Sequence, residues 1–351
     1  MMNMKKVKLS AVLLLVSAVI LLSGCGGKGN DAADAAAAGE GGKELKKLVI
    51  AEPLHYTGYL PLYVAQREGY FAGEGLEVEM LQAAGGAHVT SVVSGDAWGV
   101  IGGPESNALA NIGSSDPIVS VSNVVNRANV YLMAKKGTAP VGNSDEELKA
   151  FFQGKKVNAG RHGGTPNLLT QYLLLELGLD PQKDVRLLEP ADGSTVVAMV
   201  QQGAADIANG AEPQISDGMD KGVWDEPFYK FHDMGDYAYS VLSVKKSTLE
   251  KDPETVQKVV NAVVKALKAI QNDKVMAMKV LKEEFPTLSD TAAQAALDRA
   301  YGDQLWSPDG VISEEALDKD MNVMIKTGIF KGEYTYDALV DMQFVNKTAA
   351  K

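Results

Sequence analysis

The chain has 351 residues, a formal net charge of −11 and a single cysteine, Cys25. One cysteine excludes an intrachain disulfide and a cluster of cysteine metal ligands. The negative charge argues against nucleic acid and against an anionic membrane face as direct partners, although it does not forbid a small anion at a locally positive site. The length is sufficient for two lobes.

Residues 1–24 have the three parts of a secretory signal peptide, which is removed from the mature protein. Three lysines form the basic start, and an apolar run too short to span a membrane comfortably leads to LSGC at residues 22–25. Loss of the three lysines would bring the formal charge from −11 to −14. LSGC resembles the bacterial lipobox, which implies lipidation of Cys25 as the mature N-terminus. The alternative is an ordinary secreted protein with a stray cysteine.

Residues 25–46 are predicted to be a flexible tether behind the lipidated cysteine. The segment is rich in Gly, Ala and Asp and has almost no large apolar residue, so it cannot form a core. A tether and a lipid anchor fit together, because a globular body must stand off a membrane surface. We therefore expect a location in the cell envelope, outside the cytoplasm, with attachment to the membrane through Cys25.

The body alternates predicted strands and helices from residue 47 onward. LVIA and LEVEM predict short strands, and GYLPLYVAQREGYF between them predicts a helix with Pro61 near its start and a stop at Gly69. GAHVTSVVSG has valines at helical spacing. WGVIGG then predicts a strand, and Pro104 begins a new helix after the Gly102-Gly103 bend.

A similar unit recurs in the second half, since VVSGDAWGVIGGPE and MVQQGAADIANGAEP both indicate a helix, a strand and a bend. Repeated βαβ units predict mostly parallel sheets flanked by helices. We interpret VYLMAKKG and YSVLSVKKS as two inter-lobe crossings. Residues 47–135 and 241–351 would form lobe 1, residues 136–240 lobe 2, and the helical tail, beginning with the Asp252-capped DPETVQKVVNAVVKALKAI, would pack on lobe 1.

The ordered set of segments is similar to the substrate-binding proteins of the nitrate/sulfonate/taurine and thiamine-precursor transporters. GYLPLYVAQREGYFAGEGLEVEM, VVSGDAWGVIGG and RHGGTPNLLTQYLLLELGLDPQKDVRLLEP carry the resemblance, over about residues 45–213. Trp98 departs from it, because that family usually has Asp there. The resemblance implies an α/β, two-lobed type II periplasmic-binding fold that delivers a solute to an ABC permease. The sequence lacks a GxxxxGK[ST] motif, so the ATPase would be a separate chain.

Ligands of such sheets bind beyond the carboxyl ends of the strands, and candidate residues are concentrated there. The competing interpretations are a structural histidine at 55, a plain turn at Gly85-Gly86, a helix-dipole role for Glu105, a structural cap in HGGTP and a solvated loop at Arg127. The residues that we expect to bind the ligand are His55, Tyr56, Gly86, Glu105, Ser106, Asn126, His162, Gly163, Gly164, Thr165 and Glu212.

The preferred function is capture of a small nitrogen- or sulfur-containing organic solute for import by a monomeric receptor. The alternatives are a receptor for a membrane sensor and an enzyme resembling pyrimidine synthases, whose Cys-rich segment is missing here. No HExxH, nucleophile elbow or catalytic cysteine is present, so we expect no enzyme, no cofactor and no metal site. Helix N-termini would suit an anion, whereas Glu105 and Glu212 would suit an amine or an aminopyrimidine.

Overall fold

The computed structural model describes residues 44–349. The predicted signal peptide, the lipidation site at Cys25 and nearly all of the tether lie outside these residues. Within the described part of the chain, no helix is both long enough and apolar enough to cross a membrane.

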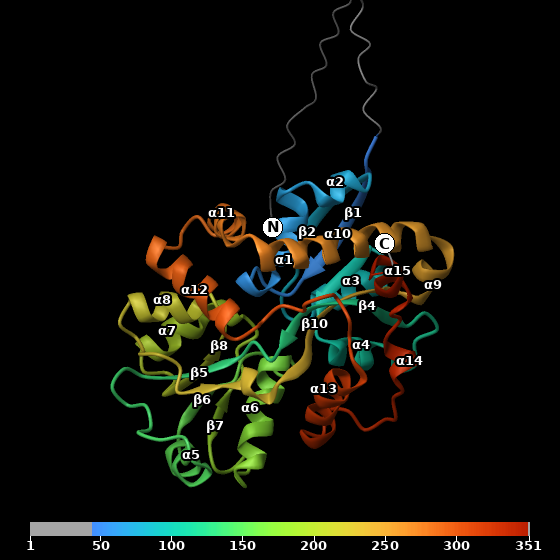
Figure 1. Cartoon of the computed structure of the whole chain (residues 1–351). Helices are drawn as coiled ribbons and strands as arrows, with labels where there is room; N and C mark the ends of the chain where they lie inside the picture. The colour runs from blue at the N-terminus through green and yellow to red at the C-terminus, as the bar shows by residue number, and fades with distance from the viewer. Residues whose placement is uncertain (1–43, 350–351) are drawn as a thin grey trace, which may run out of the picture. The chain divides into compact units, whose positions relative to one another are not determined.

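Two five-stranded sheets organise the body, one in each lobe, as Figure 1 shows. In sheet order, lobe 1 contains β2 (Leu76–Gln82), β1 (Lys46–Glu52), β3 (Gly99–Gly102), β10 (Asp236–Lys245) and β4 (Ile118–Arg127). Lobe 2 contains β7 (Arg186–Leu188), β6 (Lys156–Asn158), β8 (Ile207–Gly210), β5 (Tyr131–Ala134) and β9 (Tyr229–Lys230). The two-lobed α/β fold expected from the sequence is confirmed.

The pairing within each sheet is mixed, which differs from the expected mostly parallel sheets. In lobe 1, β1 is parallel to β2 and β3, whereas β10 is antiparallel to β3 and β4. Lobe 2 repeats this arrangement, because β6 is parallel to β7 and β8, and β5 is antiparallel to β8 and β9. The antiparallel strands are those next to the inter-lobe connections, where the chain enters or leaves a sheet against the direction of the βαβ units.

The two connections between sheets are shorter than the segments that the sequence suggested. VYLMAKKG contributes β5 to the second sheet, and YSVLSVKKS lies mostly within β10 of the first. The chain therefore changes sheet at residues 128–130 and again near Gly235, before each of these segments. Both segments end at Lys-Lys, but this likeness reflects two strand ends rather than two crossings.

The repeated unit has matching backbone bonds in the two lobes. Trp98 N donates to Val49 O at 2.8 Å, and Asp206 N donates to Lys156 O at 2.8 Å. The Asp206 carboxylate also accepts from Lys156 N at 2.9 Å. Trp98 replaces that bond with partial packing against the lobe 1 core, and its Nε1 has no partner within residues 44–349.

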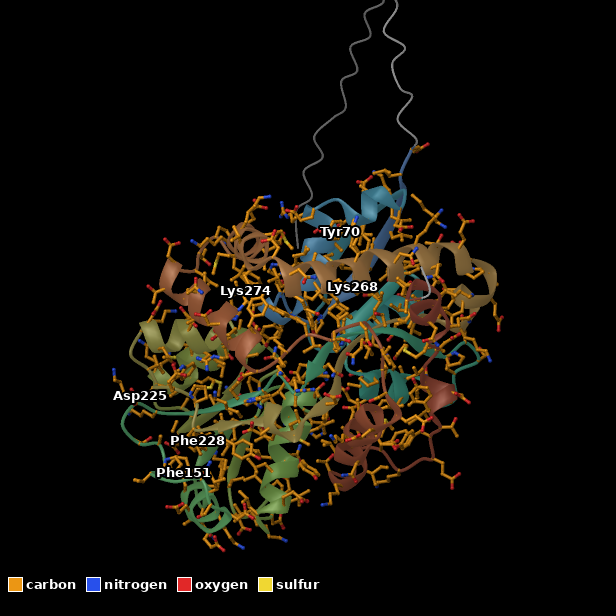
Figure 2. The ribbon with its side chains drawn as sticks, in the orientation of Figure 1. Tyr70, Phe151, Asp225, Phe228, Lys268 and Lys274 are labelled. Atoms are coloured by element: carbon orange, nitrogen blue, oxygen red, sulfur yellow. The ribbon has the colours of Figure 1, made fainter. Side chains whose placement is uncertain are left out.

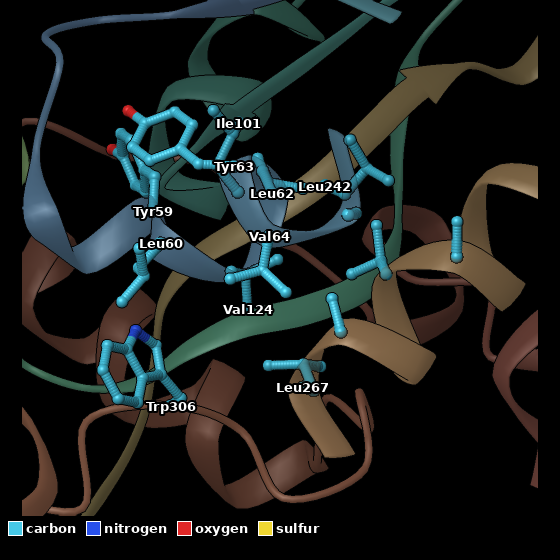
Figure 3. Packing of buried hydrophobic residues seen from close by; sticks show 14 of the residues in the cluster. Tyr59, Leu60, Leu62, Tyr63, Val64, Ile101, Val124, Leu242, Leu267 and Trp306 are labelled. Carbon is cyan, nitrogen blue, oxygen red and sulfur yellow. The ribbon is translucent and has the colours of Figure 1, made fainter. Parts of the chain in front are cut away.

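Helices of lobe 1 bury their apolar faces on its sheet, where α1 and α10 lie side by side (Figure 1). Figure 3 shows Val64, Val124 and Leu267 of α10 among the buried side chains of this core, with Leu62 beside Tyr63. The α10 valines predicted at helical spacing are buried, and the Asp252 side chain accepts from Thr255 N as a cap. The lobe 1 helices of the N-terminal half are η1 (Thr57–Tyr59), α1 (Leu60–Arg67), α2 (Tyr70–Gly73), α3 (Ala87–Ser94) and α4 (Pro104–Ala110).

Phe151 and Phe228 of lobe 2, labelled in Figure 2, meet edge to face at 5.2 Å between ring centroids, beside a core cluster that lobe 2 shares with α13 (Glu314–Lys326). Its helices are α5 (Asp145–Phe152), α6 (Thr165–Glu176), η2 (Gly193–Thr195), α7 (Val196–Gln201), α8 (Gln214–Asp220) and η3 (Phe231–Met234).

The helical tail packs on lobe 1, as the sequence led us to expect, and also contacts lobe 2. Its helices are α9 (Lys246–Lys251), α10 (Pro253–Asn272), α11 (Lys274–Glu284), α12 (Asp290–Gly302), α13 (Glu314–Lys326), α14 (Tyr336–Leu339) and α15 (Gln343–Ala349). The α12 helix contacts α8, and its Arg299 binds Glu212 and Glu226, which lie before and after α8 in the chain. The α13 helix contacts α6 as well as β10. These bonds and contacts join the tail to lobe 2.

Candidate functional site

A cavity of about 130 Å³ lies between the two lobes, at the carboxyl ends of β1, β3, β6 and β8. This is where open α/β sheets bind ligands. Its polar side chains come from both lobes and, through Asn129, from the connection between the two sheets. They are Tyr56, Tyr59, His88, Glu105, Ser106, Asn129, Asn158, Arg161, Thr165, Asn209, Gln214, Tyr239 and Ser240.

Gly102 and Gly103 leave room for two buried side chains at the cavity wall. A Cβ at Gly103 would lie 1.8 Å from Glu105 Oε2, and a Cβ at Gly102 would lie 3.3 Å from the His88 ring. The Glu105 side chain thus folds back over the residue that precedes α4. The glycine bend in VIGGPESNAL is explained by this close approach, since Gly103 has an ordinary extended backbone.

Glu105 connects the two lobes from a buried position. Its Oε1 accepts from Thr165 Oγ1 of lobe 2 at 2.5 Å and from Ser106 Oγ at 3.2 Å. Burial raises the pKa of the Glu105 carboxyl, while these hydroxyls and the positive charge of Arg161 oppose the rise. Its Oε2 has no hydrogen-bond partner within the described residues. One carboxyl oxygen therefore forms a cross-lobe bond, and the other is unpaired.

His88 lies against Gly102 on the same cavity wall and is a neutral imidazole. Burial, together with the charge of Arg161, lowers the pKa of His88 to about 4. A neutral ring has one donor and one acceptor nitrogen. His88 lines the cavity, and its buried Nδ1 has no hydrogen-bond partner among residues 44–349.

The cationic group of the cavity is Arg161, in the loop before α6. Its Nη1 donates to the carbonyl oxygen of His162 at 3.1 Å. A Cβ built on Gly164 would lie 3.3 Å from Arg161 Nη2, and one on Gly86 of lobe 1 would lie 3.8 Å from Nη1. The guanidinium therefore extends from lobe 2 toward lobe 1. Thr165 does not cap α6, because its hydroxyl donates to Glu105 instead.

Amide side chains at strand ends complete the lining, and sequence analysis missed them. Asn158 ends β6, and Asn209 is near the end of β8. Asn209 Nδ2 donates to Ala159 O and to Thr170 Oγ1, which holds the β8 end against α6. The signal for both is a single Asn where an apolar strand stops, in KVN and IANG. This signal points to a ligand site only when the repeated units of the two lobes are compared with each other.

Of the residues predicted from sequence, Tyr56, Glu105, Ser106, Gly164 and Thr165 line the cavity. Gly86 and Gly163 lie next to lining residues without being part of the lining.

The other predicted residues have partners outside the lining. His55 pairs with Glu52, and the exposed His162 pairs with Glu189 at 3.0 Å. Asn126 Oδ1 accepts from Asn123 Nδ2 at 2.7 Å.

Arg127 and Glu212 also bind neighbours outside the lining. Arg127 binds Asp236. Glu212 binds Arg299 and Ser216, and burial raises its pKa against the effect of these partners. The Glu212 backbone carbonyl accepts from Thr57 Oγ1 at 3.1 Å, a second bond between the lobes.

A model of the NMT1-like family matches residues 53–282. The chain belongs to this family. It is 26% identical over 314 residues to the putative binding protein YtlA of Bacillus subtilis (strain 168), covering 88% of this chain and 91% of YtlA. These findings confirm the resemblance that the ordered segments indicated.

The solved structures most useful for comparison share the fold at low identity. The nitrate-binding protein NrtA from Synechocystis PCC 6803 has a TM-score of 0.72 at 17% identity, over 88% of this chain and 89% of NrtA. The sulphonate-binding protein SsuA from Escherichia coli has a TM-score of 0.66 at 14% identity, over 83% and 96%. The desulfurization enzyme DszB has a TM-score of 0.61 at 14% identity, over 87% and 99%. The fold therefore occurs in both binding proteins and an enzyme, and function must be argued from the site.

Proposed function

We propose that this chain is the extracytoplasmic solute receptor of an ABC importer, and that the inter-lobe cavity holds the solute. The observation that carries the proposal is a cavity at strand ends, lined by polar groups from both lobes. No group of three or more His, Cys, Asp or Glu side chains within residues 44–349 is arranged to bind a metal ion. The family membership and the similarity to YtlA support binding rather than catalysis.

The lining favours a small organic solute that has an anionic group as well as nitrogen or sulfur. A cavity of about 130 Å³ is close to the roughly 150 Å³ of an engineered cavity that binds benzene. Arg161 suits an anionic oxygen group, because a guanidinium forms charge-assisted bonds with such groups. Unpaired Glu105 Oε2 and His88 Nδ1 would bond to polar atoms on the rest of the solute.

The partners follow from this proposal. The solute passes to a membrane permease, and a separate ATPase chain supplies the energy. Cys25 carries the lipid, the segment between Cys25 and the start of β1 at Lys46 tethers a monomeric receptor, and the receptor works outside the cytoplasm. Cys25→Ser should leave the protein without lipid and move it from the membrane fraction to the soluble fraction. Mass spectrometry and fractionation check this. The prediction is wrong if the wild type carries no lipid and the variant stays in the membrane fraction.

The direct test of the solute site is mass spectrometry of purified protein under conditions that preserve complexes. It should show a bound molecule, and calorimetric titration should then rank nitrate, taurine, an alkanesulfonate and an aminopyrimidine. Arg161→Gln should weaken binding of an anionic member about ten- to a hundredfold, because a bond to a charged group contributes roughly 1.5–3 kcal/mol. Arg127→Gln is the matched control, since Arg127 binds Asp236 outside the cavity. Equal losses in both variants would contradict the assignment of Arg161.

A further inference from the structure

The loop of residues 53–56, between β1 and η1, forms part of the lobe 1 wall of the cavity. Leu54 and Tyr56 both line it. A Cβ built on Gly193 of lobe 2 would lie 3.1 Å from Leu54 Cδ1 and 3.6 Å from the Tyr56 hydroxyl. Gln214 of lobe 2 is a further neighbour of the Tyr56 hydroxyl. The position of this loop therefore decides how closely the lobes meet.

His55 lies between these two lining residues, and its side chain belongs to another cluster. Its Nδ1 lies 3.0 Å from Glu52 Oε1, and its Nε2 lies 3.5 Å from Glu284 Oε2. The ring packs against Tyr63 and Phe285, with centroids 4.5 and 4.7 Å away. One ring thus connects the cavity loop to β1 and to the end of α11.

The cluster around His55 contains two carboxylates and one guanidinium, so one further positive charge would balance it. Glu52 comes from β1, Glu284 from α11, and Tyr63 and Arg67 from α1. The Tyr63 hydroxyl donates to Glu52 Oε2 at 2.6 Å, and Arg67 pairs with Glu284. An imidazolium donates from both ring nitrogens and can bond to both carboxylates, whereas a neutral imidazole can donate to only one of them.

We propose that His55 is a positioning residue whose imidazolium ties the 53–56 loop to Glu52 and Glu284, and so holds the lobe 1 wall of the cavity against lobe 2. The relevance of this role to transport rests on the function proposed above, whereas the contacts of His55 do not depend on that function. The cavity therefore closes less completely when His55 loses its proton.

The direction of the pH dependence follows from the surroundings of His55. Burial alone lowers the pKa of His55, but the bond and charge of Glu52 and the charge of Glu284 outweigh it, so the net pKa lies above the usual 6.5. Loss of the proton removes the charged bonds to Glu52 and Glu284, and with them the stabilisation of the loop position. Closure should therefore weaken as the pH rises through the His55 pKa, which lies above 6.5.

The test measures the distance between the lobes without any solute. Spin labels are placed by Val93→Cys and Val141→Cys in the full chain carrying Cys25→Ser, because both valines are exposed, one in each lobe. Pulsed electron resonance then follows the label distance from pH 5.5 to 8.5. In the protein that keeps His55, the population of molecules with a long distance between the labels should increase as the pH rises. His55→Gln should show that population at every pH, and His55→Lys, which stays cationic, at none.

His162→Gln is the matched control, because it removes an exposed histidine–glutamate pair outside the cavity lining. It should follow the pH series of the original histidine protein. If His55→Gln matches that series at all pH values, the proposal is wrong.

If His55→Gln does not fold, the proposal is tested by measuring amide hydrogen exchange of residues 53–59 in the unsubstituted protein. That exchange must rise between pH 5.5 and 8.5 by more than the intrinsic chemical rate, and if it does not the proposal fails. Failure to find any bound solute would contradict the importer function but would leave these distance results unaffected.

Discussion

Gly103 and Glu105 act as one unit, because the carboxyl of one occupies the side-chain space of the other. A Cβ at position 103 would lie 1.8 Å from Glu105 Oε2. Gly103→Ala should therefore displace the carboxyl and destabilise the protein by about 1–3 kcal/mol, the usual result of overpacking. Thermal melting measures this. Gly73→Ala is the control, because nothing lies within 4 Å of its new methyl group, and equal melting shifts in the two variants would contradict the steric account.

The buried Glu105 carboxyl should also make stability depend on pH. Its pKa is raised by burial from the ordinary 4.5, so the folded protein disfavours its ionised form. Such a group stabilises the fold at low pH and loses that contribution as the pH rises through the folded pKa. Glu105→Gln cannot ionise, so it should melt above the wild type near pH 8 and approach it near pH 4. Melting curves check this, with the exposed Glu77→Gln as control; a constant offset between the two proteins would argue against it.

Single residues also show where prediction from sequence stopped. Glu105 and Thr165 were found because each stands beside a glycine bend and a proline that marks a helix start. Asn158 and Asn209 have no such signal, since an asparagine after an apolar strand is equally common in an ordinary turn. His55 was predicted at the strand end, but it lies in the loop that follows β1, where its ring pairs with Glu52 instead of lining the cavity.

At the scale of elements, periodicity predicted the long helices better than the short strands. The apolar face of α10 repeats over 20 residues, and its predicted positions are buried. The strands β6 and β7 have three residues each, which is too few for an alternating pattern to define a face. The direction of a strand could not be predicted from the local sequence pattern, because β10 joins the sheet of lobe 1 through partners more than 100 residues earlier in the chain.

The N-cap of α10 offers a test at this scale. The Asp252 carboxylate accepts from Thr255 N at 3.3 Å and also pairs with Lys46 of β1. Asp252→Ala should cost about 0.5–2 kcal/mol, as loss of such caps does. Lys46→Met removes the ion pair and keeps the cap, so it should cost less, because exposed pairs contribute about 0.2–1 kcal/mol. Denaturant midpoints measure both, and a larger loss for Lys46→Met would mean that the ion pair dominates.

For the whole body, the balance between open and closed lobes is the property on which solute capture depends. The lobes are joined by the Thr165–Glu105 and Thr57–Glu212 bonds and by Arg299 of the tail, which binds Glu212 and Glu226 of lobe 2. A solute shifts this balance only through its different affinity for the two states. The cross-lobe bond nearest the cavity should therefore influence closure before any solute is present.

Thr165→Val keeps the shape of the side chain and removes the hydroxyl that bonds to Glu105. The solute-free variant should have a larger radius of gyration than the wild type, because the buried Glu105 oxygen gains by becoming hydrated in the open state. Small-angle scattering measures this, and a bound solute should reduce the radius in both proteins. Thr327→Val is the control, since the hydroxyl bonds that Thr327 makes among the described residues go to carbonyls of its own helix. Equal radii for Thr165→Val and wild type, with and without bound solute, would show that this bond does not govern closure.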